Sequence, residues 1–253
     1  MALKRSDGRG PSELRPLQAE LDFISYPEGS VLFSSGDTRV LCNVSVEPGV
    51  PAWMQLKGLP GGWITAEYAM LPRATHTRSR RETDRPRARS QEIRRLIGRS
   101  LRAAFDLEKL PQITCIIDCD VLQADGGTRT ASISAGYIAL ALALYRQVEL
   151  GKANSEIFLP AVAAVSAGLF DGETIVDLDY AEDSSADFDL NVVMNANNAL
   201  IEIQGTAEAG AIERSDFLEL LSLTEHAVVE IHKFQQECLA AAGVSLDPKV
   251  WGF

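Results

Sequence analysis

The sequence predicts an α+β fold in which long helices pack against mixed sheets. Apolar residues alternate in paired stretches that are typical of strands, and a long stretch with helical periodicity follows each group of strands. No linker, repeat or low-complexity tract interrupts the 253 residues. We therefore expect a single domain over residues 1–253, with two halves of sheet and helix at roughly 1–150 and 151–253.

The composition places the chain among ordinary soluble globular proteins. Hydrophobic residues make up 46% of it and charged residues 23%, and no run of about 18 apolar residues predicts a membrane span. Residues 1–10 lack the apolar core of a secretory signal. The four cysteines form no Cys-x-x-Cys pair, and the three histidines lack the spacing of a zinc motif. We expect a cytoplasmic protein with no membrane partner.

Four stretches of the first half have the pattern of strands. Residues 29–50 contain two of them around the turn "SSGDT", and "WITAEYAML" at 63–71 forms a third after a glycine-rich connection. In "ITCIIDCDV" at 113–121 apolar residues recur at every second position. Cys115 and Cys119 share the apolar face, which predicts that they are small core residues.

Two helices are predicted in the same half. Residues 75–88 are polar, contain Pro86 and have no apolar period, so we expect a loop there. The first helix starts at Ser90, and arginines cover much of the surface opposite its apolar residues, which are Ile93, Leu96, Ile97, Leu101 and Phe105. Residues 130–150 are apolar nearly all round, which predicts a buried second helix.

The stretch "QADGGTRTAS" at 123–132 joins the last of these strands to the buried helix. A glycine turn at a helix start presents unpaired backbone N–H groups at the positive end of the helix dipole, which is a site for an anion such as phosphate. Arg129 adds a planar donor fork suited to phosphate oxygens. The alternative is an ordinary glycine turn beside a solvated arginine.

The charge of the chain is unevenly distributed. The net charge is −11, yet residues 73–102 hold 11 arginines, no lysine and three acids. The rest of the chain carries 13 basic and 32 acidic residues. This contrast favours a local site for a polyanion, in which arginine makes bidentate phosphate contacts, over general polyanion binding. A solvated loop followed by a helix with a polar face is the alternative.

The second half repeats the style of the first. Residues 161–180 read as a hairpin around Asp171-Gly172, and residues 188–205 as a second hairpin around "ANN". We expect Ser215 to be the N-cap of a long amphipathic helix. Its apolar positions are Phe217, Leu220, Leu221, Thr224, Val228, Ile231 and Phe234.

Between the two hairpins lies a dense group of carboxylates. The stretch "LDYAEDSSADFDLN" contains Asp179, Glu182, Asp183, Asp187 and Asp189. Such acids repel one another unless a cation or protons relieve them. Asp187 and Asp189 would share one strand face, and Asp183 would fold back beside them. Oxygen ligands of this kind suit Mg²⁺ or Mn²⁺, and an exposed acidic loop is the alternative.

A phosphate cradle, an arginine-rich segment and a carboxylate cluster together are what phosphoryl transfer on a nucleic acid requires. At these motifs the sequence closely resembles the RNase PH family, the bacterial phosphorolytic 3′→5′ exoribonucleases (tRNA nucleotidyltransferases) that trim tRNA precursors. The resemblance covers nearly the whole chain. It is carried by "RSDGR", "GDTRVLCNVSVEPGVP", "WITAEYAMLPRATHTR", "RRLIGRSLRA", "DCDVLQADGGTRTASI", "LDYAEDSSADFDLNVVM" and "IEIQGTAE". Departures are minor: Ser6 stands where the family usually has proline, and the tail "GVSLDPKVWGF" has no clear counterpart.

The resemblance implies the fold shared with ribosomal protein S5 domain 2 and the exosome core, in rings of six subunits built as a trimer of dimers. It implies that inorganic phosphate is a co-substrate bound by Arg89, Gly127, Thr128 and Arg129. Asp183 and Asp189 match the catalytic positions and would hold Mg²⁺ or Mn²⁺, whereas Asp187 is less constant in the pattern. Arg73, Arg78, Arg80 and Arg81 would contact the RNA backbone.

The implied reaction releases nucleoside 5′-diphosphates from the 3′ ends of tRNA precursors and other structured RNAs, and its reverse adds nucleotides from diphosphates. Two rival functions remain. One is a non-catalytic RNA-binding subunit of an exosome-like ring, which would lack the phosphate arginine or the aspartate pair. The other is a hydrolytic metal-dependent nuclease, which would use water in place of phosphate.

Overall fold

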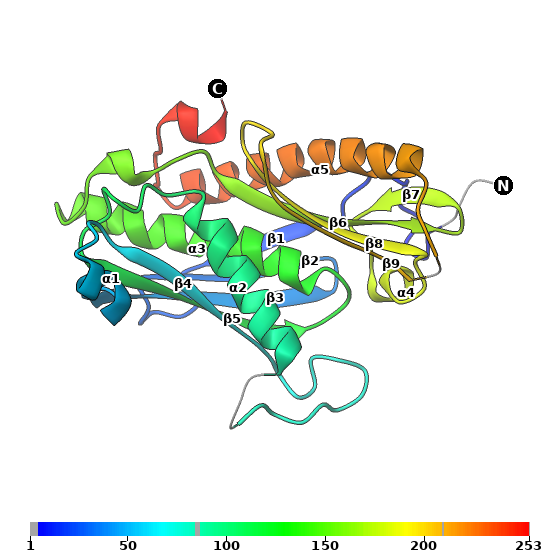
Figure 1. Cartoon of the computed structure of the whole chain (residues 1–253), viewed down its shortest axis with the longest axis horizontal. Helices are drawn as coiled ribbons and strands as arrows, with labels where there is room; N and C mark the ends of the chain where they lie inside the picture. Colours follow the sequence, from blue (N-terminus) through cyan, green and yellow to red (C-terminus); the bar gives the residue numbers. More distant parts are fainter. Residues whose placement is uncertain (1–4, 84–86, 209, 253) are drawn as a thin grey trace.

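The computed structural model describes residues 5–83, 87–208 and 210–252, and within them the chain forms two sheets and three long helices (Figure 1). The five-stranded sheet has the order β1 (Leu17–Leu21), β2 (Gly29–Ser35), β3 (Thr38–Pro48), β5 (Ile113–Gln123) and β4 (Trp63–Met70). The four-stranded sheet has the order β7 (Glu173–Val176), β6 (Val162–Phe170), β8 (Phe188–Asn195) and β9 (Leu200–Ala207). The helices are α1 (Ala52–Lys57), α2 (Ala88–Arg102), α3 (Thr128–Glu149), α4 (Tyr180–Asp183) and α5 (Arg214–Ala241). The predicted α+β fold is confirmed.

The pairing of the strands follows the connections between them. Neighbours joined by short turns are antiparallel, as in the β2–β3, β6–β7 and β8–β9 pairs. Strands β4 and β5 are parallel because the chain crosses over through α2 between them. The five-stranded sheet is therefore mixed, and the four-stranded sheet is antiparallel.

Helix α3 lies between the two sheets, and α5 covers the outer face of the four-stranded sheet (Figure 1). Strand β6 has a buried face on either side: Val162 and Ala164 belong to the core around α3, and Ala163 and Val165 pack in the cluster beneath α5. Helix α2 packs on β4 and against α3, so it shares the middle layer. Both halves of the chain thus contact the helix that follows the glycine turn.

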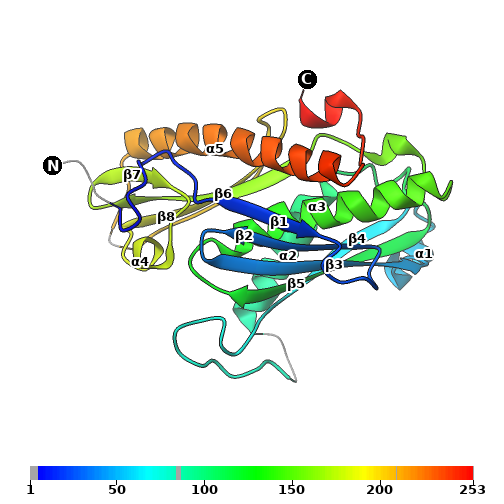
Figure 2. The ribbon, with the colours of Figure 1, turned by 180° about the vertical axis from the view of Figure 1, so that it is seen from behind.

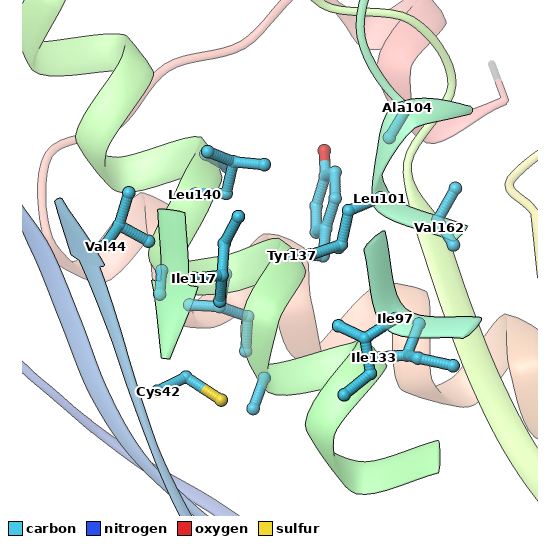
Figure 3. Packing of buried hydrophobic residues seen from close by; sticks show 14 of the residues in the cluster. Cys42, Val44, Ile97, Leu101, Ala104, Ile117, Ile133, Tyr137, Leu140 and Val162 are labelled. Carbon is cyan, nitrogen blue, oxygen red and sulfur yellow. The ribbon is translucent and has the colours of Figure 1, made fainter. Parts of the chain in front are cut away.

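The main core surrounds α3, as the sequence predicted. Residues 130–144 are buried all round the helix, and Tyr137 belongs to the same core cluster as Leu101 of α2 and Val162 of β6 (Figure 3). Cys115 and Cys119 are fully buried, which confirms them as core residues. Cys119 faces Cys42 across the β3–β5 pair, with the two Sγ atoms 3.4 Å apart as free thiols.

Some local expectations were wrong. Helix α2 begins at Ala88, two residues before the expected Ser90. Helix α5 begins at Arg214 with Glu213 as its N-cap, and the hydroxyl of Ser215 instead donates to the carboxylate of Asp216. Strand β1 and the short helices α1 and α4 were not expected at all, because segments of four to six residues carry too little periodicity. The loop before α2 is confirmed where it is described, and Pro86 lies outside the described residues.

The C-terminal tail, which the family resemblance left unassigned, closes the core around α3. Its 3₁₀ turn at Pro248–Trp251 buries Val250 and Trp251, and the Trp251 ring meets the Tyr137 ring edge-on with centroids 6.2 Å apart. The N–H of Ala161 donates to the carbonyl of Val250 at 2.7 Å. Within the described part of the chain, no helix combines the length and the apolar character that crossing a membrane requires.

One histidine is held neutral where α5 meets the rest of the core. His232 is buried, and its Nδ1 lies 3.0 Å from Oε1 of Gln235. The amide nitrogen of Gln235 donates to the carbonyls of Ser134 and Val162, so its oxygen is left to accept from His232. Burial lowers the pKa of His232 to about 4, although the hydrogen bond with Gln235 acts in the opposite direction.

We predict that His232 makes the protein less stable in acid. Between its ordinary pKa of about 6.5 and its folded pKa of about 4, the unfolded chain takes up a proton that the folded chain does not, so the free energy of unfolding falls with pH. The effect is at most about 3 kcal/mol across this window. Urea unfolding of the wild type and of His232→Gln measures it, and the wild type should lose more stability on acidification. The exposed His226 provides the control as His226→Gln, and equal pH slopes in all three proteins would contradict the prediction.

Candidate active site

The glycine turn predicted to hold an anion has the required backbone geometry. Gly126 and Gly127 both adopt left-handed conformations, with φ of 74° and 61°, and α3 begins at the next residue, Thr128. Gly127 is the N-cap and has no side chain, so the amide groups of the first turn carry no side-chain cap. They point out of the positive end of a helix whose body is fixed in the core.

The turn is pressed against the segment that carries the acidic cluster. A Cβ atom on Gly126 would lie 2.3 Å from the carbonyl oxygen of Leu178, so only glycine fits there. The hydroxyl of Thr38 donates to the carbonyl of Gly126 at 2.7 Å and accepts from the N–H of Asp125 at 2.9 Å. The backbone N–H of Tyr180 donates to the carboxylate of Asp125 at 3.3 Å. Residues far apart in the sequence thereby meet at one edge.

Two polar side chains orient the start of α3. The hydroxyl of Tyr68 on β4 shares a 2.9 Å hydrogen bond with Oγ1 of Thr128. Nη1 of Arg129 donates to Oε1 of Gln204 on β9 at 2.9 Å and lies 3.6 Å from a carboxylate oxygen of Glu92. Burial raises the pKa of Tyr68, and the hydrogen bond with Thr128 only partly offsets it, so Tyr68 stays neutral. These contacts hold the two residues that would face a bound phosphate.

Asp183 and Asp189 share one electrostatic environment with the arginines predicted to bind phosphate. Asp183 ends α4, and Asp189 lies on β8, where Nδ2 of Asn191 donates to both of its oxygens at 3.3 Å. Burial raises the pKa of both carboxyls, and the neighbouring charge of Asp183 brings that of Asp189 to about 6. The charges of Arg89 and Arg129 act on both in the opposite direction. The structure thus brings together the residues named for catalysis and phosphate binding, while their roles stay predictions.

The other acids of the cluster have different surroundings. The carboxylate of Asp179 caps α4 by accepting from the N–H of Glu182 at 2.9 Å. Glu182 is buried and forms a two-pronged ion pair with Arg5, with both N–O distances 2.7 Å. Asp187 precedes β8 and is exposed. Asp179 and Glu182 therefore serve the local fold, and the acids of this dense stretch do not share one environment.

The fit of a divalent ion rests on two carboxylates. In the chain as described (5–83, 87–208 and 210–252), no group of three or more His, Cys, Asp or Glu residues could hold a metal ion. Asp183 and Asp189 are half-buried, and Asp189 lies close enough to Asp183 for the charge of Asp183 to raise its pKa. Mg²⁺ is commonly held by one or two carboxylates, with waters and substrate phosphates as its other ligands. The two carboxylates therefore fit such an ion if waters and the substrate supply its remaining ligands.

The basic loop lies beside the glycine turn and α4. Arg73, Arg78, Arg80 and Arg81 are exposed, and the described part of the loop extends away from the sheets (Figure 1). Its base is fixed to the glycine turn, because the N–H of Ala124 donates to the carbonyl of Ala74 at 2.8 Å. The ring of His76 lies 5.7 Å from the ring of Tyr180 on α4. Arg89 is exposed in the first turn of α2.

An anion cradle that faces two carboxylates, with exposed arginines alongside, defines a phosphoryl-transfer site that suits a nucleic acid. Comparison with known families agrees with this class. Residues 13–145 match domain 1, and residues 161–227 match domain 2, of the 3′ exoribonuclease family, RNase PH. The chain belongs to this family.

Individual relatives agree in sequence and in fold. The chain is 50% identical over 242 residues to "Ribonuclease PH" of Crocosphaera subtropica (strain ATCC 51142 / BH68), covering 96% of this chain and 100% of the relative. Its structure is similar to rice Rrp46 (TM-score 0.74, 22% identity, 93% of this chain and 100% of that one). It is also similar to the Archaeoglobus fulgidus exosome with RNA bound to the active site (TM-score 0.76, 24% identity, 91% and 92%). These two likenesses establish the fold.

Several residues of the site were not predicted. Tyr68 follows the alternation of its strand and reads as core, and Gln204 is one polar residue among others on β9. Neither residue could be recognised from its neighbours in the sequence, because each forms its hydrogen bond with a residue of a different element. The "RSDGR" motif was noticed only for its family resemblance, although Arg5 proves to hold Glu182.

We predict that the turn tolerates no side chain at Gly126. Gly126→Ala combines the strain of a left-handed backbone with overlap against Leu178, and it should lower the free energy of unfolding by about 3 kcal/mol or more. Gly172→Ala is the matched control, because Gly172 has φ of 77° with nothing within 4 Å of an added Cβ, and it should cost about 1 kcal/mol. Urea unfolding of both variants measures the difference. Equal losses would show that the turn is not pressed against the carboxylate-bearing segment.

Proposed function

We propose that this protein is a phosphate-dependent 3′→5′ exoribonuclease that trims the 3′ ends of tRNA precursors and other structured RNAs. The observation that carries the proposal is the meeting of the uncapped N-terminus of α3, Arg129, Asp183 and Asp189 at one edge of the molecule. Membership of the 3′ exoribonuclease family and the 50% identity to a ribonuclease PH support it. The reverse reaction would extend RNA from nucleoside diphosphates, because the phosphoanhydride bond that forms and the phosphodiester bond that breaks are nearly balanced in free energy.

The proposed chemistry exchanges one phosphorus–oxygen bond for another. An oxygen of inorganic phosphate attacks the last internucleotide phosphorus, and the bond from that phosphorus to the 3′ oxygen of the preceding ribose breaks. The products are a nucleoside 5′-diphosphate and an RNA shortened by one residue, whose new 3′ oxygen takes up a proton. The amides of Gly127 and Thr128, with Arg89 and Arg129, hold the attacking phosphate and offset its charge.

Asp183 and Asp189 would hold Mg²⁺ or Mn²⁺ at this site. Bound there, the ion supplies positive charge to the phosphoryl oxygens as negative charge builds up on them. Both carboxyls lie partly buried, where a charge acts more strongly than it does in water. Asn191 keeps the carboxylate of Asp189 in place through its amide hydrogen bonds.

The RNA strand would lie along the basic loop. Arg73, Arg78, Arg80 and Arg81 are exposed and suit the phosphates of the backbone, and such contacts carry little sequence information. Neutralising Arg78, Arg80 and Arg81 should therefore flatten the salt dependence of RNA binding by roughly 0.7 per lost contact, and an unchanged slope would contradict this role. The same variant should lose less of its degradation rate on a very short RNA.

We further propose a hexamer built as a trimer of dimers, acting in the cytoplasm. The likeness to exosome structures supports a ring, and the free thiols of Cys42 and Cys119, 3.4 Å apart, suit a reducing compartment. Sedimentation at assay concentration tests the assembly, and a fully active monomer would refute it.

A non-catalytic RNA-binding ring subunit is the alternative from another class. The chain has both the arginines proposed to bind phosphate and the aspartate pair, which supports the enzyme over this alternative. A hydrolytic nuclease is the other alternative, and it would use water in place of phosphate. Activity that depends on added phosphate separates the proposed enzyme from both.

We predict that Arg129→Ala loses most of the phosphate-dependent degradation. One fork of a preorganised anion site is worth about 2–4 kcal/mol in the transition state, so kcat/KM should fall by about 10²–10³. RNA binding should change little, because Arg129 holds the small anion. The measurement is the rate of RNA shortening against phosphate concentration. Arg99→Ala is the control, since Arg99 pairs with Glu202 at 2.8 Å on the neighbouring surface, and near-normal activity of Arg129→Ala at limiting phosphate would contradict the role.

We predict that Asp183→Asn and Asp189→Asn each lower turnover by roughly 10²-fold or more, because Asn keeps the shape and loses the charged ligand. Phosphate and RNA binding should persist, and the melting temperature should hold or rise slightly as repulsion between buried charges is relieved. Mn²⁺ should restore part of the rate, and a chelator should stop the wild type. The exposed Asp187→Asn is the control. A destabilised variant with normal activity per folded molecule would make these carboxylates structural.

A further inference from the structure

We propose that a buried ion pair between Arg15 and Asp177 is a positioning device that sets the phosphate-binding turn against the segment carrying Asp183. This inference rests on the proposed function, and it adds Arg15 and Asp177 as residues that govern turnover without touching the substrate. Figure 2 shows the N-terminal segment running past β7 and α4 before it enters β1.

The pair has the geometry of a rigid clamp. Nε and Nη2 of Arg15 donate to the two carboxylate oxygens of Asp177 at 3.1 and 2.7 Å, and the backbone N–H of Arg15 adds a third hydrogen bond at 2.7 Å. Their side chains are only 4% and 8% exposed. Burial acts to raise the pKa of Asp177, and the charge and hydrogen bonds of Arg15 outweigh it, so the pKa is lowered. Asp177 therefore stays ionised and bound.

Asp177 is fixed by its backbone as well. It has a left-handed conformation with φ of 51°, and its N–H donates to the carbonyl of Ser166 at 2.6 Å. Its carbonyl accepts from the guanidinium groups of Arg5 at 3.0 Å and Arg9 at 3.2 Å. Residue 177 is thus held on all sides, only six residues before Asp183, and Arg5 also anchors Glu182 in the intervening helix.

The other end of the Arg15 guanidinium reaches the phosphate-binding turn. Its Nη1 donates to the backbone carbonyl of Asp125. A Cβ atom built on Gly127 would lie 3.1 Å from Nη2 of Arg15, so the guanidinium also lies directly against the N-cap of α3. The charge of Arg15 is felt by Asp183 as well. One planar group therefore contacts the turn on one side and Asp177 on the other.

Stability alone does not account for such a pair. Two charges removed from water cost roughly as much solvation as their attraction returns, and well-packed apolar residues of the same size often do as well. A guanidinium fork fixes direction and distance in a way that apolar contacts do not. Arg15 and Asp177 lie behind the turn rather than at the reacting groups, so they act through Gly127 and Asp183. A displacement of about 1 Å at such a site costs up to about 10²-fold in rate.

The test uses Arg15→Lys, which keeps the charge and loses the fork, and Asp177→Asn, which keeps the left-handed backbone and loses the charge. In the full-length protein, well below the melting temperature, each should lower kcat by about 10–100-fold and change KM for phosphate and for RNA by less than about 3-fold. The double variant should be no slower than the slower single variant, because both changes release the same clamp. Unchanged kcat in both single variants would overturn the proposal.

The chain offers a matched control. Nη1 and Nη2 of Arg146 donate to the two oxygens of Asp22 at 2.9 and 2.7 Å, and Asp22 also has a left-handed backbone with φ of 56°. This pair lies near the other end of α3, about 25 Å along the helix from Arg129. Arg146→Lys and Asp22→Asn should leave kcat unchanged. A loss of kcat equal to that of the Arg15 and Asp177 variants would overturn the positioning role.

A second measurement does not depend on activity. Hydrogen exchange of the amides at 125–130 and 178–185 should speed up in Arg15→Lys and Asp177→Asn, while exchange at the distant end of α3 stays as in the wild type. Unchanged exchange at both segments would overturn the clamp. A wild type that degrades RNA without phosphate would instead overturn the proposed function. The hydrogen-exchange result would still show whether the Arg15–Asp177 pair holds the two segments in place.

Discussion

Helix α3 is enclosed on all sides, and this enclosure determines where the site lies. Because residues 130–144 pack against both sheets, the axis of the helix is fixed in the interior and its first turn emerges where the two halves of the chain meet. The positive end of the helix dipole is therefore presented at a constant position. The two glycines before it allow the chain to turn from β5 into α3 without a side chain that would cover the amides.

The same edge gathers charges of both signs. Asp183 and Asp189 lose hydration on burial, which raises the pKa of both carboxyls. The charge of Asp183 raises the pKa of Asp189 further, while Arg89 and Arg129 stabilise the ionised forms. N-terminal arginines pair with two other acids in or next to this segment, Arg5 with Glu182 and Arg15 with Asp177. Asp183 and Asp189 instead lie in the field of Arg89 and Arg129, next to the anion cradle. Phosphoryl transfer depends on positive charge that offsets the developing charge of the phosphoryl oxygens, and arginines together with a cation held by carboxylates can supply it.

The fold class was predictable because strand alternation and the all-round apolarity of α3 are local patterns in the sequence. The candidate site was predictable in part, because the glycine turn and Asp183 lie in motifs with their own spacing. The sequence did not separate Asp179 and Glu182 from the carboxylates that face the arginines, since all of them share one short stretch. Tyr68, Arg15 and Asp177 were missed because each acts on a partner more than 50 residues away, and such contacts depend on the folded chain.

The origin of the terminal phosphate in the released nucleotide tests the central claim most directly. RNA degraded in the presence of isotopically labelled inorganic phosphate should yield nucleoside 5′-diphosphates, with the label in the terminal phosphate. No shortening of the RNA should occur when phosphate is omitted. Unlabelled nucleoside monophosphates, formed at the same rate without phosphate, would contradict the account and identify water as the nucleophile.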